Sequence, residues 1–363
     1  MITKNNAKLN TPYRRPRKDA RTMADVAFDA QKIAFAPISF QAALALRDLG
    51  ILEFLNNVPA DDKTLAKKLK LSLYAVQTLL ENGVALSIVA QDEKGLYSLT
   101  KTGWFLLCDP MTRANMDFVN DICYLGMHSL KESLKKGKPT GLKVFGKWKT
   151  VYEGLSKLPA KNRKSWFAFD HFYSDIAFPE ILPLVFELTP KRIMDIGANT
   201  GKWAKKCLEY DKNVQMTLVD LPGQLNVAKK NLKKYGSRAE FCAANVLDEK
   251  TVLPKGADAV LMSQFLDCFS EEQIVSILKK VKAAADKNTR IYILEPLWDR
   301  QEYEAAAFCL NHTSLYFTNI ANGNSKMYSA AQMEACIKKA GLKVEKMFDG
   351  VGRFAYTLIR CVK

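Results

Sequence analysis

Residues 192–222 hold the pattern that most limits how this chain can fold. A short apolar run ends in Asp195, a turn with Gly197 and Gly201 follows, and an amphipathic stretch leads to a second apolar run that ends in Asp220. This order predicts a strand, a helix and a second, parallel strand. Glycine in the turn lets the backbone approach a ligand closely. An acid at the end of the second strand can accept both hydroxyls of a ribose, so the stretch predicts a site for an adenosine-containing cofactor.

The first turn indicates which class of cofactor fits. Dinucleotide-binding turns have the pattern G-x-G-x-x-G, and a free helix N-terminus receives the pyrophosphate. Here the pattern is Asp-x-Gly-x-x-x-Gly, and it begins at Asp195. An acid at this point would repel a phosphate but would suit a cationic amine. S-adenosylmethionine (SAM) carries an ammonium and a sulfonium and no phosphate, so SAM is the predicted cofactor; a purely structural turn is the alternative.

Length and composition limit the class of protein. A chain of 363 residues suggests two domains. It has no run of 18 apolar residues and no apolar stretch behind its basic start, so we expect neither a membrane span nor a secretory signal. The eight cysteines are scattered and form no C-x-x-C pair, which argues against a metal site and for a reducing, cytoplasmic setting.

The net charge of +16 calls for a test of nucleic-acid binding. Residues 1–22 carry a net charge of +6 (seven Lys/Arg against Asp19), and residues 131–164 carry +9 (eleven Lys/Arg against two Glu). The excess therefore lies in an N-terminal tail, which we expect to be disordered, and in a connecting segment. A solvated basic face is the simplest interpretation, and contact with RNA, an acidic partner or anionic lipid stays open.

Residues 23–110 are expected to form a first, α-helical domain. Two helices joined by a tight turn, with start signals at Asp61 and Ser72, precede the hairpin sequence IVAQDEKGLYSLT, which together predict a winged helix. Its second helix, residues 72–84, offers only Gln77 and Asn82 to a base edge and no cation. We therefore expect packing rather than nucleic-acid recognition, with an apolar helix over residues 31–46 as the surface of a homodimer.

The rest of the chain predicts a connector and an α/β domain. Residues 111–185 read as helical and rich in aromatic side chains, suited to enclose a flat aromatic acceptor. Residues 186–363 alternate strands and helices, which predicts a Rossmann-like parallel sheet with helices on both faces. The last two strands, LKVEKMFDG and RFAYTLIRC, are joined by a short turn. Such a closing antiparallel hairpin distinguishes a class I methyltransferase sheet from a nicotinamide-binding one.

Several further motifs resemble one family. These are ALALRDLGILEFL, LAKKL, LLENGV, YSLTKTGWFL, SLKESLKKGKP, DIGANTG, VDLPG, ADAVLMSQFLDCF, ILEP and KKAGLKV. Over residues 25–363 the chain resembles the winged-helix class of SAM-dependent O-methyltransferases, the bacterial relatives of plant phenol and caffeate O-methyltransferases. VDLPG after such a turn is the most specific of these motifs.

The resemblance implies roles for individual residues. Asp195, Gly197 and Gly201 would shape the methionine end of the cofactor pocket. Asp220 would hold the ribose, with Leu221 against the adenine. The remaining implied cofactor contacts are Asn245 and Val246 at the adenine edge and Ser263 next to the fourth strand. Transfer of the methyl group would leave S-adenosylhomocysteine, and no metal is implied.

The chain departs from the family pattern at three places. Ala198 and Asn199 fill a turn that usually has more glycine, and Asn245 stands where the family has Asp. The third departure concerns catalysis, because the family's catalytic base is the histidine of a Leu-His-Asp-Trp motif. This chain reads Leu-Asp-Cys-Phe there, so Asp267 stands at the histidine position.

The departure at Asp267 leaves the base open. A phenol has a pKa of about 10 and a histidine about 6.5, whereas a carboxylate near 4 is a weaker base unless burial raises its pKa. Asp267 is therefore a candidate base, or alternatively a positioning group or a helix cap. His312 is a second candidate base, and Glu295 is expected to orient whichever base operates.

The leading hypothesis is a homodimeric methyltransferase acting on a phenolic or polyketide-like hydroxyl of a small molecule. Methylation at carbon or nitrogen is a second hypothesis, because the demand for a base differs there. A third is a SAM-binding protein that binds or methylates nucleic acid, which lacks support from any base-methylating motif after the fourth strand. A fourth is a relative that binds the cofactor and has lost catalysis.

Overall fold

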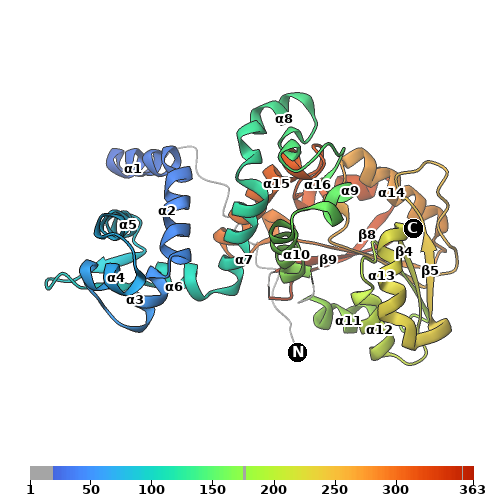
Figure 1. Ribbon diagram of the computed structural model, residues 1–363. Coiled ribbons are helices and arrows are strands. Elements are labelled where there is room, and N and C mark those ends of the chain that lie inside the picture. Colours follow the sequence, from blue (N-terminus) through green and yellow to red (C-terminus); the bar gives the residue numbers. More distant parts are fainter. Residues whose placement is uncertain (1–18, 175–176, 354) are drawn as a thin grey trace. The chain divides into compact units, whose positions relative to one another are not determined.

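The computed structural model describes residues 19–174, 177–353 and 355–363, and these form two compact units (Figure 1). One unit ends at Asp121, and the other begins at Ile122. The predicted basic tail lies almost wholly outside the described residues. No helix in the described part of the chain is both long and apolar enough to cross a membrane.

The N-terminal unit is a helical domain with a small hairpin. Its elements are α1 (Met23–Ala34), α2 (Ala36–Asp48), α3 (Ile51–Asn57), α4 (Asp62–Leu69), α5 (Leu73–Ala85), β1 (Val89–Gln91), β2 (Tyr97–Leu99), α6 (Lys101–Cys108) and α7 (Pro110–Phe118). Asp61 and Ser72 cap α4 and α5 as predicted, each accepting a backbone N–H of the first turn. The antiparallel pairing of β1 with β2 confirms the predicted hairpin.

The predicted apolar helix over residues 31–46 is wrong in one respect. The chain breaks at Phe35, between α1 and α2, because Pro37 lies in the first turn of α2. Proline has no N–H to give to the preceding turn and is favoured at the start of a helix. From Ala43 onward the apolar side chains of α2 are buried inside the unit, so only the earlier part of the predicted surface is exposed.

A series of helices follows along the chain before the first strand of the large sheet. They are the π-helix η1 (Val119–Cys123), η2 (Gly126–Ser129), α8 (Leu130–Lys136), η3 (Thr140–Val144), α9 (Val151–Gly154), η4 (Leu155–Lys157), α10 (Ala160–Ser174) and α11 (Phe178–Phe186). Apart from the start of η1, these helices belong to the C-terminal unit.

A seven-stranded sheet organises the C-terminal unit. Its strands are β3 (Arg192–Ile196), β4 (Gln215–Asp220), β5 (Ala239–Ala243), β6 (Ala259–Ser263), β7 (Arg290–Glu295), β8 (Lys343–Val351) and β9 (Tyr356–Val362). The spatial order is β5-β4-β3-β6-β7-β9-β8. The first five strands are parallel, and β9 pairs antiparallel with both β7 and β8. The predicted parallel sheet and its closing hairpin are therefore confirmed.

Helices and tight turns connect these strands. They are α12 (Lys202–Tyr210), α13 (Pro222–Leu232), η6 (Lys233–Arg238), η7 (Leu266–Cys268), α14 (Glu271–Ala284), η8 (Trp298–Arg300), α15 (Glu304–Tyr316), the π-helix η9 (Phe317–Ala321) and α16 (Ala330–Lys339). From β3 the chain first adds β4 and β5 on one side of the sheet and then returns to add β6 and β7 on the other side. Ligands of open α/β sheets bind at such a point, outside the carboxyl ends of the strands.

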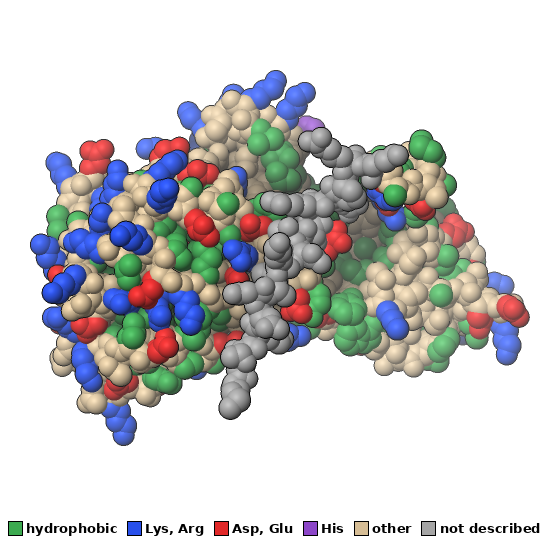
Figure 2. All heavy atoms as spheres, turned by 180° about the vertical axis from the view of Figure 1, so that it is seen from behind, with side chains coloured by type: hydrophobic (Ala, Val, Ile, Leu, Met, Phe, Trp, Pro, Cys, Tyr) green, Lys and Arg blue, Asp and Glu red, His purple; other side chains and the backbone are tan. Residues whose placement is uncertain are grey.

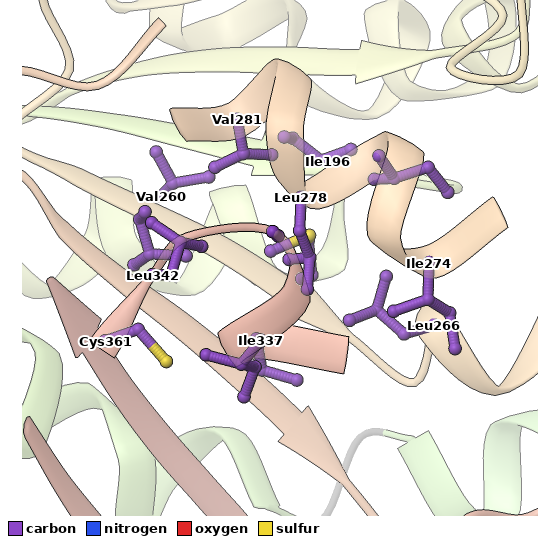
Figure 3. Close-up of a cluster of buried hydrophobic side chains, with 14 of the residues drawn as sticks. Ile196, Val260, Leu266, Ile274, Leu278, Val281, Ile337, Leu342 and Cys361 are labelled. Atoms are coloured by element: carbon purple, nitrogen blue, oxygen red, sulfur yellow. The ribbon is translucent and has the colours of Figure 1, made fainter. Parts of the chain in front are cut away.

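Successive side chains along a strand are buried on opposite faces of the sheet. Met194 and Ile196 of β3 belong to one apolar cluster, and Ile193 belongs to the other. Figure 3 shows the first cluster, where Ile196 and Val260 lie beside residues of α14 and α16. Leu266 is part of the same cluster. Its burial anchors the short turn η7, and the residue after it is Asp267.

Candidate active site

The turn after β3 has the backbone geometry that the sequence predicts. Gly197 has φ +78°, and its N–H donates to the carbonyl of Val219 on β4. A Cβ at Gly197 would collide with the ring of Phe265. Gly201 also has φ +78°, and a Cβ there would lie 2.9 Å from Leu232 of α13. Gly197 thus lets the β6 loop approach the turn, and Gly201 lets α12 and α13 pack closely.

Asn199 adopts a backbone conformation for which glycine is usually required, which explains why this turn has fewer glycines than the same turn in the family. Its φ is +48°, a left-handed conformation that asparagine tolerates better than most residues. Its N–H donates to Asp220 Oδ2 over 2.8 Å, and the N–H of Leu221 donates to Asp220 Oδ1 over 2.6 Å. Two backbone donors therefore fix the predicted ribose-binding carboxylate. From the sequence Asn199 is only a departure from the family pattern, and its left-handed backbone becomes visible in the structure alone.

Asp195 is a buried acid whose charge the described protein does not balance. Its side chain is 3 % exposed, and Oδ2 has no hydrogen-bond partner among the described residues. Burial, and then the neighbouring charge of Asp220, raise the pKa of Asp195 to about 8. Burial also raises the pKa of Asp220. A cation placed beside these acids, at the carboxyl ends of β3 and β4, would therefore be strongly favoured.

Further buried polar atoms without a described partner lie at the same sheet edge. They are Ser263 Oγ, Gln264 Nε2, Asp267 Oδ1 and Glu295 Oε2, which follow or end strands β6 and β7. Each such atom costs about 1–3 kcal/mol unless it is hydrogen-bonded. Gln264 also has φ +46°, and strained backbone of this kind concentrates at functional sites. Gln264 could not be predicted from the sequence, because neither its backbone strain nor the burial of its Nε2 follows from a local pattern.

Asp267 and Glu295 form a pair of buried acids. Glu295 Oε1 accepts the N–H groups of Phe265 (3.0 Å) and Leu266 (2.8 Å), so it holds the turn that carries Asp267. Burial raises the pKa of Asp267 to about 6, and burial together with the charge of Asp267 raises the pKa of Glu295 well above its usual range. Each acid therefore holds its proton more tightly than a solvent-exposed carboxyl group does.

The structure answers one of the open alternatives for Asp267. Helix α14 is capped by Ser270, whose side chain accepts the N–H of Gln273 while Gln273 caps in return. Asp267 is therefore not the helix cap. Its side chain is 7 % exposed and points one bare carboxylate oxygen into the protein.

The remaining predicted residues lie at or beyond the strand ends. Leu221 directly precedes α13 as its N-cap and is about half exposed, and Val246 is buried. Asn245 is exposed and accepts the N–H of Leu247 over 3.0 Å, forming a local turn. His312 lies exposed on α15, where Nδ1 contacts the carbonyl of Phe308 over 2.8 Å and the ring stacks on Phe308. The structure thus gathers the acids at the sheet edge and gives His312 no described contact with them.

The acids and turns at this edge fit SAM. Asp195 would meet a positive charge with its unpartnered oxygen, and Asp220, held by the N–H groups of Asn199 and Leu221, would accept ribose hydroxyls. No phosphate is required, and two buried carboxylates would repel one. The fold and this site together define a class I methyltransferase architecture.

Comparison with known proteins places the chain more narrowly. The model of the O-methyltransferase domain matches residues 128–343, and that of the Dimerisation2-like domain matches residues 28–95. Because the first match covers more than half of the chain, the chain belongs to the O-methyltransferase domain family. It is a SAM-dependent enzyme of that family.

Individual relatives are distant but cover nearly the whole chain. The chain is 22 % identical to O-methyltransferase SfmM3 of Streptomyces lavendulae over 87 % of this chain and 95 % of that protein. It is 22 % identical to demethylspheroidene O-methyltransferase of Cereibacter sphaeroides, over 89 % and 83 %. Among solved structures, the apo SAM-dependent methyltransferase SibL aligns with a TM-score of 0.70 at 23 % identity, over 92 % of this chain and 98 % of that one.

A first prediction concerns the charge of Asp195. Because the carboxyl group is mostly protonated below pH 8 and a bound cation favours its ionised form, SAM binding at pH 7 should release most of one proton. Calorimetric titration in phosphate and in Tris, which differ in ionisation enthalpy, measures this release. Asp195→Asn should bind more weakly and release no proton. Asp220→Ala should weaken binding and reduce the release without abolishing it, because burial, the larger cause, still raises the pKa of Asp195. Wild-type binding without any proton release would contradict the assignment.

Proposed function

We propose that this protein transfers a methyl group from SAM to a hydroxyl group of a small aromatic acceptor, and that Asp267 is the general base. The observation that carries the proposal is a buried carboxylate with a free oxygen and a pKa of about 6, at the position of the family's histidine. This value lies close to the 6.5 of an ordinary histidine, so burial gives the acid a similar basicity.

The proposed chemistry follows from the residues at the sheet edge. Bound SAM supplies an electrophilic methyl group on a sulfonium and leaves as neutral S-adenosylhomocysteine. Asp267 Oδ1 accepts the proton of the acceptor hydroxyl while the acceptor oxygen forms its new bond to carbon. Glu295 fixes the turn of Asp267 through two backbone N–H groups. The apolar surroundings exclude water and favour the neutral acid that results.

Aromatic side chains of the same unit support an aromatic acceptor. The pKa of Tyr152 on α9 is raised by burial and by neighbours that include Cys268 and Asp267, so this phenol lies close to the proposed base. Trp166 Nε1 donates to the Tyr316 hydroxyl over 2.8 Å, which joins α10 to α15. A solved relative, NcsB1, was captured with SAM and 2-hydroxy-5-methyl naphthoic acid (TM-score 0.62, 19 % identity, 90 % of this chain and 95 % of that one). We propose that the connector after residue 121 forms the acceptor wall.

The second prediction tests Asp267. Asp267→Asn should lower kcat by at least about tenfold, because the amide cannot accept the proton, and should leave SAM affinity unchanged. Product formation from a panel of hydroxynaphthoates and phenols, beginning with 2-hydroxy-5-methyl naphthoic acid, measures this effect. Asp267→His is the matched rescue variant and should recover part of the rate. An amide variant as fast as wild type would place the base elsewhere, with His312 the next residue to test.

We also propose that the protein is a homodimer joined through the N-terminal unit. Helix α1 has no buried residue, and Phe28, Ile33, Phe35 and Ile38 are all more than half exposed across α1 and the start of α2. An apolar surface of this kind on a folded protein usually meets a partner. A second copy is the occupant that the matching dimerisation family favours.

The third prediction follows from that surface. Replacing Ile33 and Ile38 together by Asp should convert a dimer to a monomer. Association of two such chains would bury the new carboxylates in the interface without a counter-charge, which costs free energy. Light scattering after size-exclusion chromatography measures the mass in solution. Val252→Asp is the control, since Val252 is 80 % exposed and belongs to the other unit. A double variant that stays dimeric would refute this surface.

Nucleic acid is not the proposed partner. Gln77 Nε2 donates to Asp62 Oδ2, and Asn82 Nδ2 donates to the carbonyl of Thr78 in its own helix, so the NH₂ group of each amide already has a partner within the unit. Figure 2 shows Lys and Arg side chains scattered among acidic ones on the face it presents.

We propose a reducing, cytoplasmic setting, which the eight free cysteines support. We also propose a division into a dimerisation domain, a connector and a cofactor domain (186–363). The first compact unit continues to Asp121, so helix α7 belongs to the dimerisation domain (predicted as 23–110) and not to the predicted connector (111–185).

A further inference from the structure

Three side chains hold the segment 265–269, which carries Asp267. Glu295 accepts the N–H groups at its start, and the Tyr328 hydroxyl donates to the carbonyl of Phe269 at its end over 2.6 Å. Between them, Asn322 Nδ2 donates to the carbonyl of Cys268 over 2.8 Å. Of these three side chains, Asn322 is the one that bonds to Cys268, the residue directly after Asp267.

The amide of Asn322 is itself fixed in one orientation. Its Oδ1 accepts the N–H groups of Asn324 and Ser325, each over 3.1 Å. Its Nδ2 donates to Ser325 Oγ over 2.8 Å as well as to Cys268. With its oxygen occupied by two backbone donors, the side chain must present its NH₂ group to the base segment. The orientation therefore belongs to the loop 322–325 and does not depend on a ligand.

Asn322 also follows directly on a segment that is hydrogen-bonded to the connector. It follows the π-helix η9 (Phe317–Ala321), in which Asn319 is fully buried. Asn319 accepts the hydroxyl of Ser133 over 2.6 Å and donates to the carbonyl of Gly126 over 2.7 Å. Residues 319–322 thus bind both the proposed acceptor wall and the base segment, and π-helical turns recur at functional sites.

We propose that Asn322 is a positioning residue that holds the Cys268 carbonyl and thereby keeps Asp267 Oδ1 aimed at the acceptor. The proposal rests on the proposed role of Asp267 as the base. The carbonyl dipole next to a buried carboxylate must be paired, because its free negative end would oppose the ionised form of the acid. Asn322 pairs it with a neutral donor, and so it stabilises the ionised base without adding a charge.

Several titratable groups share the surroundings of Asp267. They are Glu295 on β7, Cys268 in the same turn, Tyr152 on α9 and Tyr328 before α16. The test therefore observes Asp267 itself. The full-length protein, labelled with ¹³Cγ-aspartate and loaded with S-adenosylhomocysteine, is titrated by NMR, and Asp267→Asn identifies the signal.

The fourth prediction compares three variants. Asn322→Ala frees the Cys268 carbonyl and should raise the pKa of Asp267 above the wild-type value near 6. Asn322→Asp adds a like charge and should raise it further. Ser325→Ala is the control, since it removes a partner of Asn322 but leaves the bond to Cys268, and its titration should match wild type. With the best acceptor of the panel, Asn322→Ala should lose about tenfold to a hundredfold in kcat, with little change in KM for SAM.

The possible results separate this proposal from the proposed function. If Asn322→Ala and Asn322→Asp titrate and turn over as wild type does, the positioning role is overturned. Equal losses in Ser325→Ala and Asn322→Ala would also overturn it, because the order of the loop, rather than the bond to Cys268, would then be responsible. If Asp267→Asn is fully active, the base assignment fails instead, and the Asn322 titrations still report whether the bond tunes Asp267. Thermal unfolding of each variant guards against loss of the fold.

Discussion

The active site depends on acidic side chains that the sheet buries and that the protein does not neutralise. Asp195, Asp267 and Glu295 lie at the carboxyl ends of β3, β6 and β7, and each keeps an oxygen without a described partner. Burying a carboxylate without a counter-charge costs free energy, so it is partly protonated until a cation or a proton donor arrives. A cationic cofactor and an acceptor hydroxyl satisfy both demands. The remaining features of the site, the left-handed turns and the clamped η7 segment, hold these acids in place.

The exchange of histidine for aspartate has a consistent electrostatic logic. A histidine base ends the reaction as a cation, whereas a carboxylate ends it as a neutral acid. In a dry pocket a neutral product is favoured, and burial has already brought the pKa of Asp267 to about 6. During transfer the positive charge on sulfur and the negative charge on the base disappear together. Surroundings of low dielectric disfavour the charged reactants and favour a reaction that removes both charges, so a buried acid suits this chemistry.

Much of the fold could be predicted because it follows from local patterns. Apolar runs gave all five parallel strands, Ser72 and Asp61 gave two helix starts, and the closing hairpin identified the kind of sheet. The predicted helix over residues 31–46 failed because Pro37 outweighed the apolar spacing. Asp267 and Glu295 could be named in advance, but their shared burial could not. Asn199, Gln264 and Asn322 matter through backbone strain and contacts distant in sequence, for which a single chain carries no local signal.

The dependence of kcat on pH, measured at saturating SAM and acceptor, tests the central claim most directly. If the ionised Asp267 is the base, kcat should be constant above neutrality and should fall as pH drops through about 6, because protonation removes the accepting oxygen. The same limb should be absent from the residual rate of Asp267→Asn. A wild-type kcat that stays level from pH 8 down to pH 5 would contradict the account.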